Sequence, residues 1–195
     1  METALGQRQG LPADLLYLSE KHPRGTWRGR SELAGAGETW LGSHDYFRAI
    51  TAKISENLVR LRERGETAYD SGAAFRRHSG SLLGGLEGHH GIEDDHYFPM
   101  FRRVEPRLIR GFDILNADHE MIHAAIYDFS ARSRDFLSRI GSSEGVMNSD
   151  QRRATDEMAE TAARFTAILR QHLGDEEDIV IPLIIEQARD DPEFG

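Results

Sequence analysis

The chain has 195 residues, which is enough for one domain with a sizeable core. Its net charge of -9 disfavours nucleic acid or an anionic membrane surface as the main partner. Because the sequence contains no cysteine, disulfides, thiolate zinc sites and cysteine-ligated iron–sulfur clusters are excluded, and any metal must be bound by nitrogen and oxygen.

Residues 1–37 are predicted to form an arm that packs on the main body. Glycine and proline recur through this segment and divide it into a short helical piece near residues 12–21 and irregular chain. His22 stands in a Lys-His-Pro loop, where a surface position is expected. The sequence shows neither a leader with a basic start and an apolar core nor a stretch of roughly 18 apolar residues, so we expect a cytoplasmic protein with no membrane partner.

Residues 38–190 are predicted to form four long helices, of which the first starts near Trp40. Apolar residues and His44 recur along it with the three-and-four spacing of one helical face, until Arg64-Gly65 stops the pattern. The second helix is expected over residues 68–98, with its end near Pro99.

The third helix follows Pro106, carries the clearest apolar stripe in the chain and ends near Gly141. The polar turn GSSEGVMNSD then leads into a fourth helix that runs towards Pro182. Because the joints between the four helices are short, the expected fold is all-α, an antiparallel up-down four-helix bundle with an N-terminal helical arm.

Polar residues interrupt the apolar stripe of every predicted helix, and we take them as candidate metal ligands. Residues four apart on a helix differ by only about 40° around the axis and about 6 Å along it, so two such side chains can reach one metal centre. His90 could be the ligand if the helix were rotated, but it is turned by about 100° from its neighbour His89, so a surface or supporting position is expected. The candidate ligands are His44, His89, Glu93, His119, His123, His172 and Glu176.

Two of the predicted helices contain an internal repeat. HHGIEDDHYFPM at 89–100 aligns without gaps with HLGDEEDIVIPL at 172–183, and both read histidine, a carboxylate four later and a proline six after that. An approximate twofold axis would therefore set Glu93 and Glu176 opposite each other, where they could bridge two cations.

The other two helices break this symmetry. HDYFRAI at 44–50 aligns with HEMIHAA at 119–125, which pairs His44 with His119 but sets Arg48 against His123. We therefore expect one metal with three histidines and a second with only two, which keeps an open position. The expected sets are His119, His123 and His172 for the first metal and His44 and His89 for the second, with Glu93, Glu176 and a solvent-derived bridge shared.

These motifs resemble the hemerythrin-like (HHE cation-binding) family over roughly residues 40 to 185. The resemblance implies a di-iron centre: two non-haem iron ions with a bridging oxygen species, held in a four-helix bundle by five histidines and two carboxylates. It also implies binding of oxygen, nitric oxide or a related small ligand, with a role in iron or oxidative-stress handling. Imidazole and carboxylate also suit manganese or zinc, and peroxide is a further candidate ligand.

The choice of the last carboxylate remains open between two neighbours. Oxygen-carrying hemerythrins place it five residues after its histidine, which here selects Glu177. We prefer Glu176, because a step of five residues turns a ligand by about 140° on a regular helix. The remaining acids nearby are expected to form a solvated face, unless one of them orients a ligand imidazole; they are Asp94, Asp95, Glu177 and Asp178.

The alternative hypothesis is a ferritin-like di-iron carboxylate oxidase or a peroxide-consuming enzyme. Glu93-x-x-His96 and Glu120-x-x-His123 both match the Glu-x-x-His motif of ferritin-like proteins. That site needs two more glutamates, and the sequence offers only Glu176. No acid–base pair stands out beyond the ligands, so a metal- and small-ligand-binding protein is favoured over a dedicated enzyme.

Overall fold

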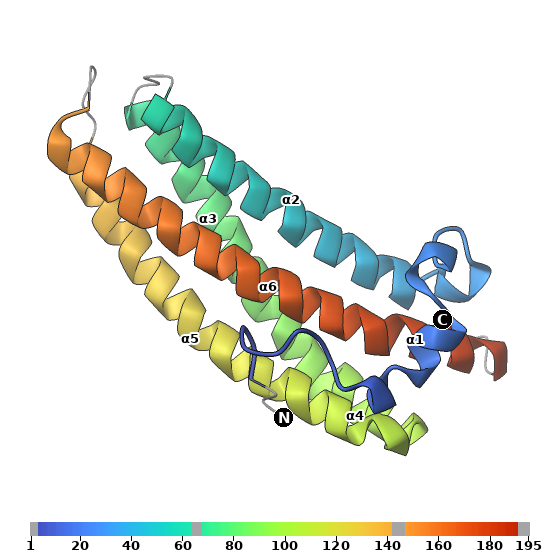
Figure 1. Ribbon diagram of the computed structural model, residues 1–195. Helices are drawn as coiled ribbons and strands as arrows, with labels where there is room; N and C mark the ends of the chain where they lie inside the picture. The colour runs from blue at the N-terminus through green and yellow to red at the C-terminus, as the bar shows by residue number, and fades with distance from the viewer. Residues whose placement is uncertain (1–3, 64–67, 142–146, 191–195) are drawn as a thin grey trace. The chain divides into compact units, whose positions relative to one another are not determined.

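The computed structural model describes residues 4–63, 68–141 and 147–190 (Figure 1). Every regular element in these ranges is helical, which confirms the all-α prediction, and none of the helices combines the length and apolarity that a membrane span requires. The elements in chain order are η1 (Ala13–Leu15), α1 (Tyr17–Lys21), η2 (Arg24–Thr26), η3 (Ser31–Leu33), α2 (Ala36–Glu63), α3 (Ala68–Ile92), η4 (Glu93–Tyr97), α4 (Phe98–Val104), η5 (Pro106–Leu108), α5 (Ile109–Ile140) and α6 (Ser149–Asp190).

The four predicted long helices correspond to α2, α3, α5 and α6. The expected stop at Arg64-Gly65, the start of the arm and most of the turn after residue 141 lie outside the described residues. The predicted end of the second helix near Pro99 is wrong, because the chain passes through the π-helical turn η4 and continues as α4. Pro99 is tolerated in the first turn of α4, where a backbone N–H has no partner within the helix.

The fourth helix also continues past its proline, since α6 holds Pro182 in its interior. An interior proline costs about 3 kcal/mol through a lost hydrogen bond and a steric clash. The residues on both sides of it are completely buried apolar side chains, and each contributes about 1.5–3 kcal/mol. Burial of Val180, Ile181 and Leu183 therefore outweighs the local cost of Pro182.

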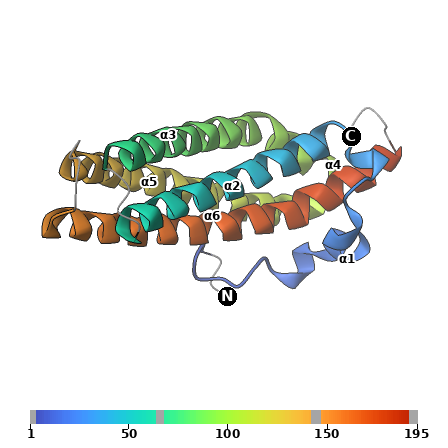
Figure 2. The same ribbon diagram turned by 90° about the horizontal axis from the view of Figure 1, so that it is seen from above.

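The chain divides into two compact units, each of which contains a length of all four long helices. The first unit comprises residues 1–46, 90–121 and 168–195, and the second comprises residues 47–89 and 122–167. The N-terminal segment belongs to the first unit and runs alongside the C-terminal part of α6 (Figures 1 and 2).

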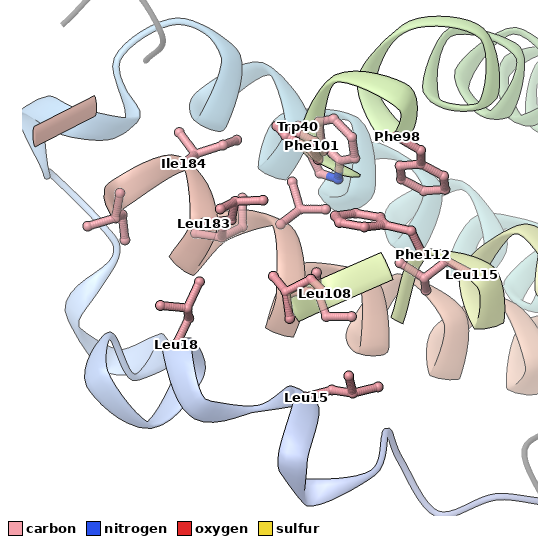
Figure 3. Packing of buried hydrophobic residues seen from close by; sticks show 14 of the residues in the cluster. Leu15, Leu18, Trp40, Phe98, Phe101, Leu108, Phe112, Leu115, Leu183 and Ile184 are labelled. Carbon is pink, nitrogen blue, oxygen red and sulfur yellow. The ribbon is translucent and has the colours of Figure 1, made fainter. Parts of the chain in front are cut away.

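The core of the first unit is a cluster of large apolar and aromatic side chains (Figure 3). Phe101 of α4 lies between Trp40 and Phe112, with ring centroids 5.9 Å and 5.8 Å away respectively. Leu15 and Leu18 of the N-terminal segment join the same cluster, so burial of apolar surface anchors this segment to its unit.

The core of the second unit is built around phenylalanines that pack on one another. Phe75 of α3 lies 4.9 Å from Phe136 and 6.5 Å from Phe129 of α5, measured between ring centroids. Phe165 of α6 packs against Phe129 at 5.1 Å. The stripes predicted along α3, α5 and α6 therefore meet in this unit.

Candidate metal centre

Three completely buried imidazoles meet in the first unit. His90 comes from α3, His119 from α5 and His172 from α6, and one ring nitrogen of each lies within 4.8 Å of the others. The His90 and His119 rings stack with their centroids 4.1 Å apart, and the His172 ring stands edge-on to His119 at 4.8 Å. Three imidazole nitrogens at this separation can act as ligands of one metal ion.

A second group in the same unit combines an imidazole with two carboxylates. Donor atoms of His44 from α2, Glu93 from η4 and Glu176 from α6 lie within 4.8 Å of one another, and all three residues are buried. Nε2 of His44 is 3.4 Å from Oε1 of Glu176, which also accepts a hydrogen bond from the indole N–H of Trp40.

The two carboxylates connect this group with the three histidines. Oε2 of Glu176 lies 3.1 Å from Nε2 of His172, and Oε2 of Glu93 lies 3.5 Å from Nε2 of His119. Each carboxylate therefore has one of the three imidazoles beside it, an arrangement that suits bridging between two neighbouring cations.

A carboxylate on the Nδ1 side orients each of three imidazoles. Nδ1 of His44 donates to Glu177 at 2.9 Å, Nδ1 of His119 donates to Asp94 at 2.8 Å, and Nδ1 of His172 donates to Asp118 at 3.4 Å. Such a bond fixes the tautomer and the ring orientation, and it directs Nε2 towards the metal in many metalloproteins. The same arrangement at three positions indicates that Nε2 is the functional atom.

Several donor atoms are buried without a hydrogen bond. Among the described residues, Nε2 of His119, Nε2 of His172 and Oε2 of Glu176 have no hydrogen-bond partner and no contact with solvent. Burying such groups costs free energy unless something compensates them. A cation would compensate all three, and a set of nitrogen and carboxylate donors fits iron, manganese or zinc.

The pKa values of the two buried glutamates are shifted in opposite directions. Burial raises the pKa of Glu93 well above its ordinary value, and the nearby charge of Glu176 raises it further. Burial would also raise the pKa of Glu176, but the charges of the neighbouring His44 and His172 hold it well below its ordinary value. In the metal-free site Glu176 therefore gives up its proton more readily than Glu93 does.

Metal binding at pH 7 is expected to release protons. Burial alone would lower the pKa of His172, but the neighbouring carboxylates of Asp118 and Glu176 raise it to about 9, so the metal-free imidazolium must lose a proton before Nε2 can bind a metal. Metal affinity should therefore rise as the pH increases towards 9. Titration calorimetry with zinc in two buffers of different ionisation enthalpy measures this release, and equal heats in both buffers would contradict it.

The histidine set differs from the one that the sequence predicts. His90, expected at the surface or in a supporting position, is 0% exposed and stacks on His119 within the three-histidine group. His123, predicted for that group, belongs to the second unit and is half-buried. His89 is also half-buried in the second unit, where its ring packs on Phe47 with the centroids 5.3 Å apart.

The helical phase of α3 explains the position of His90. Buried residues recur along it at Phe75, Ser79, Leu82, Leu86 and His90. His89 lies three residues after Leu86 and His90 lies four residues after it, and both steps keep the spacing of one face. The four-residue step deviates from a full turn by about 40°, whereas the three-residue step deviates by about 60°. His90 therefore lies nearer the centre of the buried face than His89 does.

Other predictions near the site have mixed outcomes. Of the two candidates for the last carboxylate ligand, Glu176 belongs to the carboxylate group, whereas Glu177 bonds to Nδ1 of His44 from behind. His96 and Glu120 of the ferritin-like motifs are exposed, which removes the geometric basis of that alternative. The predicted surface position of His22 is wrong: the residue is buried, and its Nε2 lies 2.8 Å from Glu186.

Of the residues behind the ligands, Asp94 and Glu177 are among the acids that the sequence offered for orienting an imidazole, whereas others were missed. Asp118 directly precedes His119 and contacts His172, Trp40 precedes His44 by four residues, and Arg8 reaches the site from the N-terminal segment. Among these three residues, only Asp118 could have been recognised from the sequence, because it is a lone acid on the buried face of the helix with the clearest apolar stripe. The hydrogen bonds of Arg8 and Trp40 span more than a hundred residues and leave no local pattern.

Comparison with known proteins agrees with this geometry. The model of the hemerythrin HHE cation-binding domain matches residues 36–184, which is well over half of the chain and includes all seven predicted ligands as well as His90. Searches of curated proteins and of solved structures find no significant match. The chain belongs to the hemerythrin HHE cation-binding family.

Proposed function

We propose that the protein binds two non-haem iron ions and uses them to bind oxygen, nitric oxide or a related small ligand. The observation that supports this most is the cluster of buried imidazoles in the first unit, with one carboxylate beside His119 and another beside His172. In an apolar core such a cluster is unfavourable without a cation, and the family is a cation-binding one.

The residues have distinct roles in this proposal. His90, His119 and His172 hold one ion, while His44 holds the other, together with His89 as the sequence predicts. Glu93 and Glu176 serve both ions. An iron pair held there would supply a redox-active centre for a small exogenous ligand.

The protein's own residues provide the surroundings for that ligand. The donors of the first unit are at most 1% exposed, so bulk water is excluded from them. Trp40 donates to Glu176, and the Trp40 ring packs 5.1 Å from that of Tyr97, which gives this side of the site an aromatic wall. A dry, aromatic wall favours a small apolar ligand over a charged substrate.

Anaerobic loading with ferrous iron followed by exposure to air tests the proposal. We expect an absorption band that appears with oxygen and disappears when oxygen is removed, with a related change when nitric oxide or azide is added. Irreversible oxidation with turnover of peroxide would favour a peroxide-consuming enzyme instead. A protein that takes up iron but shows no response to any of these ligands would overturn the proposal.

A further inference from the structure

The N-terminal segment lies outside the part of the chain that matches the family, yet two of its arginines reach the carboxylates behind the metal centre. The family match begins at residue 36, whereas Arg8 and Arg24 precede it. Both arginines contact acidic residues that are themselves bonded to candidate ligand histidines. The segment is therefore in contact with the groups that orient the site.

Arg8 binds the carboxylate of Asp118 through both terminal nitrogens of its guanidinium group. Nη1 donates to Oδ1 of Asp118 at 2.7 Å, and Nη2 donates to Oδ2 of the same carboxylate. Nε and Nη2 also contact Asp175, at 2.9 Å and 2.7 Å. The Arg8 side chain is 3% exposed, so this forked ion pair is shielded from solvent and fixes the plane of Asp118.

The backbone around Arg8 is fixed to α6 on both sides. The amide of Gly6 donates to the side chain of Gln171 at 3.1 Å, and that side chain donates back to the carbonyl of Arg8 at 2.9 Å. Gly6 and Gly10 adopt φ values of 79° and 146°, which side-chain-bearing residues rarely adopt. The path of the segment therefore presents Arg8 to Asp118 in one orientation.

Arg24 makes an equivalent contact with the carboxylate behind His44. Its Nη1 donates to Oε2 of Glu177, its Nε lies 2.8 Å from Asp178, and its Nη2 donates to the carbonyl of Gly174. The other oxygen of Glu177 accepts the bond from Nδ1 of His44. The guanidinium also lies 5.0 Å from the centre of the Trp27 ring, which limits its movement.

The third supported histidine provides an internal comparison. Asp94, which accepts from Nδ1 of His119, is part of η4, within the family match. The centre thus has one carboxylate–histidine pair from the common fold and two whose carboxylates are held by the N-terminal segment. Each of these two pairs belongs to a different donor group, since His172 is in the three-histidine group and His44 in the carboxylate group.

We infer that Arg8 and Arg24 are positioning residues of the metal centre: Arg8 acts through Asp118 on His172, and Arg24 acts through Glu177 on His44. This inference rests on the proposed function, because the positioned Nε2 atoms are those that would bind the ions. Partners behind a ligand typically change metal affinity about 10- to 100-fold when they are lost. The N-terminal segment therefore controls how tightly each of the two ions is held.

Three variants of the full-length chain test the inference. Arg8→Lys keeps the charge between Asp118 and Asp175 but loses the fork, and Arg24→Gln removes a side chain that is 43% exposed and thus tolerates replacement. Arg28→Gln is the matched control, because Arg28 lies in the same segment, is 92% exposed and pairs with the exposed Asp45, at 3.7 Å. Each protein is loaded anaerobically with ferrous iron, and release of iron to a chelator is followed in time.

We expect Arg8→Lys and Arg24→Gln each to release one of the two ions about 10- to 100-fold faster than the unmodified protein, and the double variant to release both. Visible spectra of the cobalt-substituted proteins should shift in the same two variants, and Arg28→Gln should match the unmodified protein in both measurements. Melting of the metal-free proteins identifies any variant that does not fold; if Arg8→Lys unfolds, Arg24→Gln decides.

Unchanged iron release from folded Arg24→Gln and Arg8→Lys would overturn the inference, and so would an equal effect of Arg28→Gln, which would point to general loosening of the segment. In both cases the unmodified protein still retains iron and the proposed function stands. If the unmodified protein takes up no iron, the proposed function fails and the inference fails with it.

Discussion

Replacing Glu176 with glutamine is expected to abolish stable iron binding. Glu176 is completely buried beside two imidazoles, with Nε2 of His44 at 3.4 Å and Nε2 of His172 at 3.1 Å. The amide keeps the volume of the side chain and an acceptor for Trp40, but it removes the negative charge that both ions would share. The loss should therefore exceed the roughly 10- to 100-fold that removal of a supporting partner costs.

Competition with a chelator for ferrous iron, together with elemental analysis of the purified protein, measures this loss. Glu160→Gln is a matched control, since Glu160 is also on α6 but its side chain is 75% exposed. The control should retain iron as the unmodified protein does. If folded Glu176→Gln binds iron with unchanged affinity, Glu176 is not a ligand and the assignment of the carboxylate group is wrong.

Removing the metal is expected to lower the melting temperature of the protein by about 8–16 °C. A ligand that binds only the folded state at about 1,000 times its dissociation constant stabilises that state by about 4 kcal/mol. For a chain of this size, 1 kcal/mol corresponds to a shift of about 2–4 °C. The donors come from α2, α3, η4, α5 and α6, so the unfolded chain cannot present them together.

Thermal unfolding under anaerobic conditions, with and without ferrous iron, provides the measurement. Glu176→Gln should show little iron-dependent shift, which separates binding at the centre from binding to exposed acids. Identical melting temperatures with and without iron in the unmodified protein would contradict this prediction.

The sequence predicts the helices well because their periodicity is strong. The stripe along residues 109–140 and its end near Gly141 both agree with α5, whose last residue is Ile140. Pro99 and Pro182 are poor guides to the helix ends, because the sequence shows where a proline destabilises a helix locally but not whether burial of neighbouring side chains offsets this. The continuation of α6 to Asp190 depends on the core of the first unit, which no local pattern describes.

The candidate site is predictable in part for the same reason. Spacing finds His44, His119, His172 and Glu176, because each replaces an apolar residue on a buried face. It favours His89 and does not identify His90 as a ligand, although both positions satisfy the alternation of three and four residues after Leu86. That choice depends on which side of α3 faces the other helices.

The arginines of the supporting shell could not be predicted from spacing. The bond between Arg8 and Asp118 joins residues 110 positions apart, and the bond between Arg24 and Glu177 joins residues 153 apart. In the sequence, Arg8 is one polar residue in a segment rich in glycine and proline. Only the folded path of that segment shows that its positive charges meet the acids behind the histidines.

X-ray absorption spectroscopy combined with elemental analysis of the anaerobically iron-loaded protein tests the central claim most directly. The account predicts about two iron ions per chain, with a first coordination shell rich in imidazole nitrogen. It also predicts an iron–iron scattering signal, because the two ions lie close to each other. A protein that holds no iron after loading, or a single ion surrounded mainly by carboxylate oxygen, would contradict it.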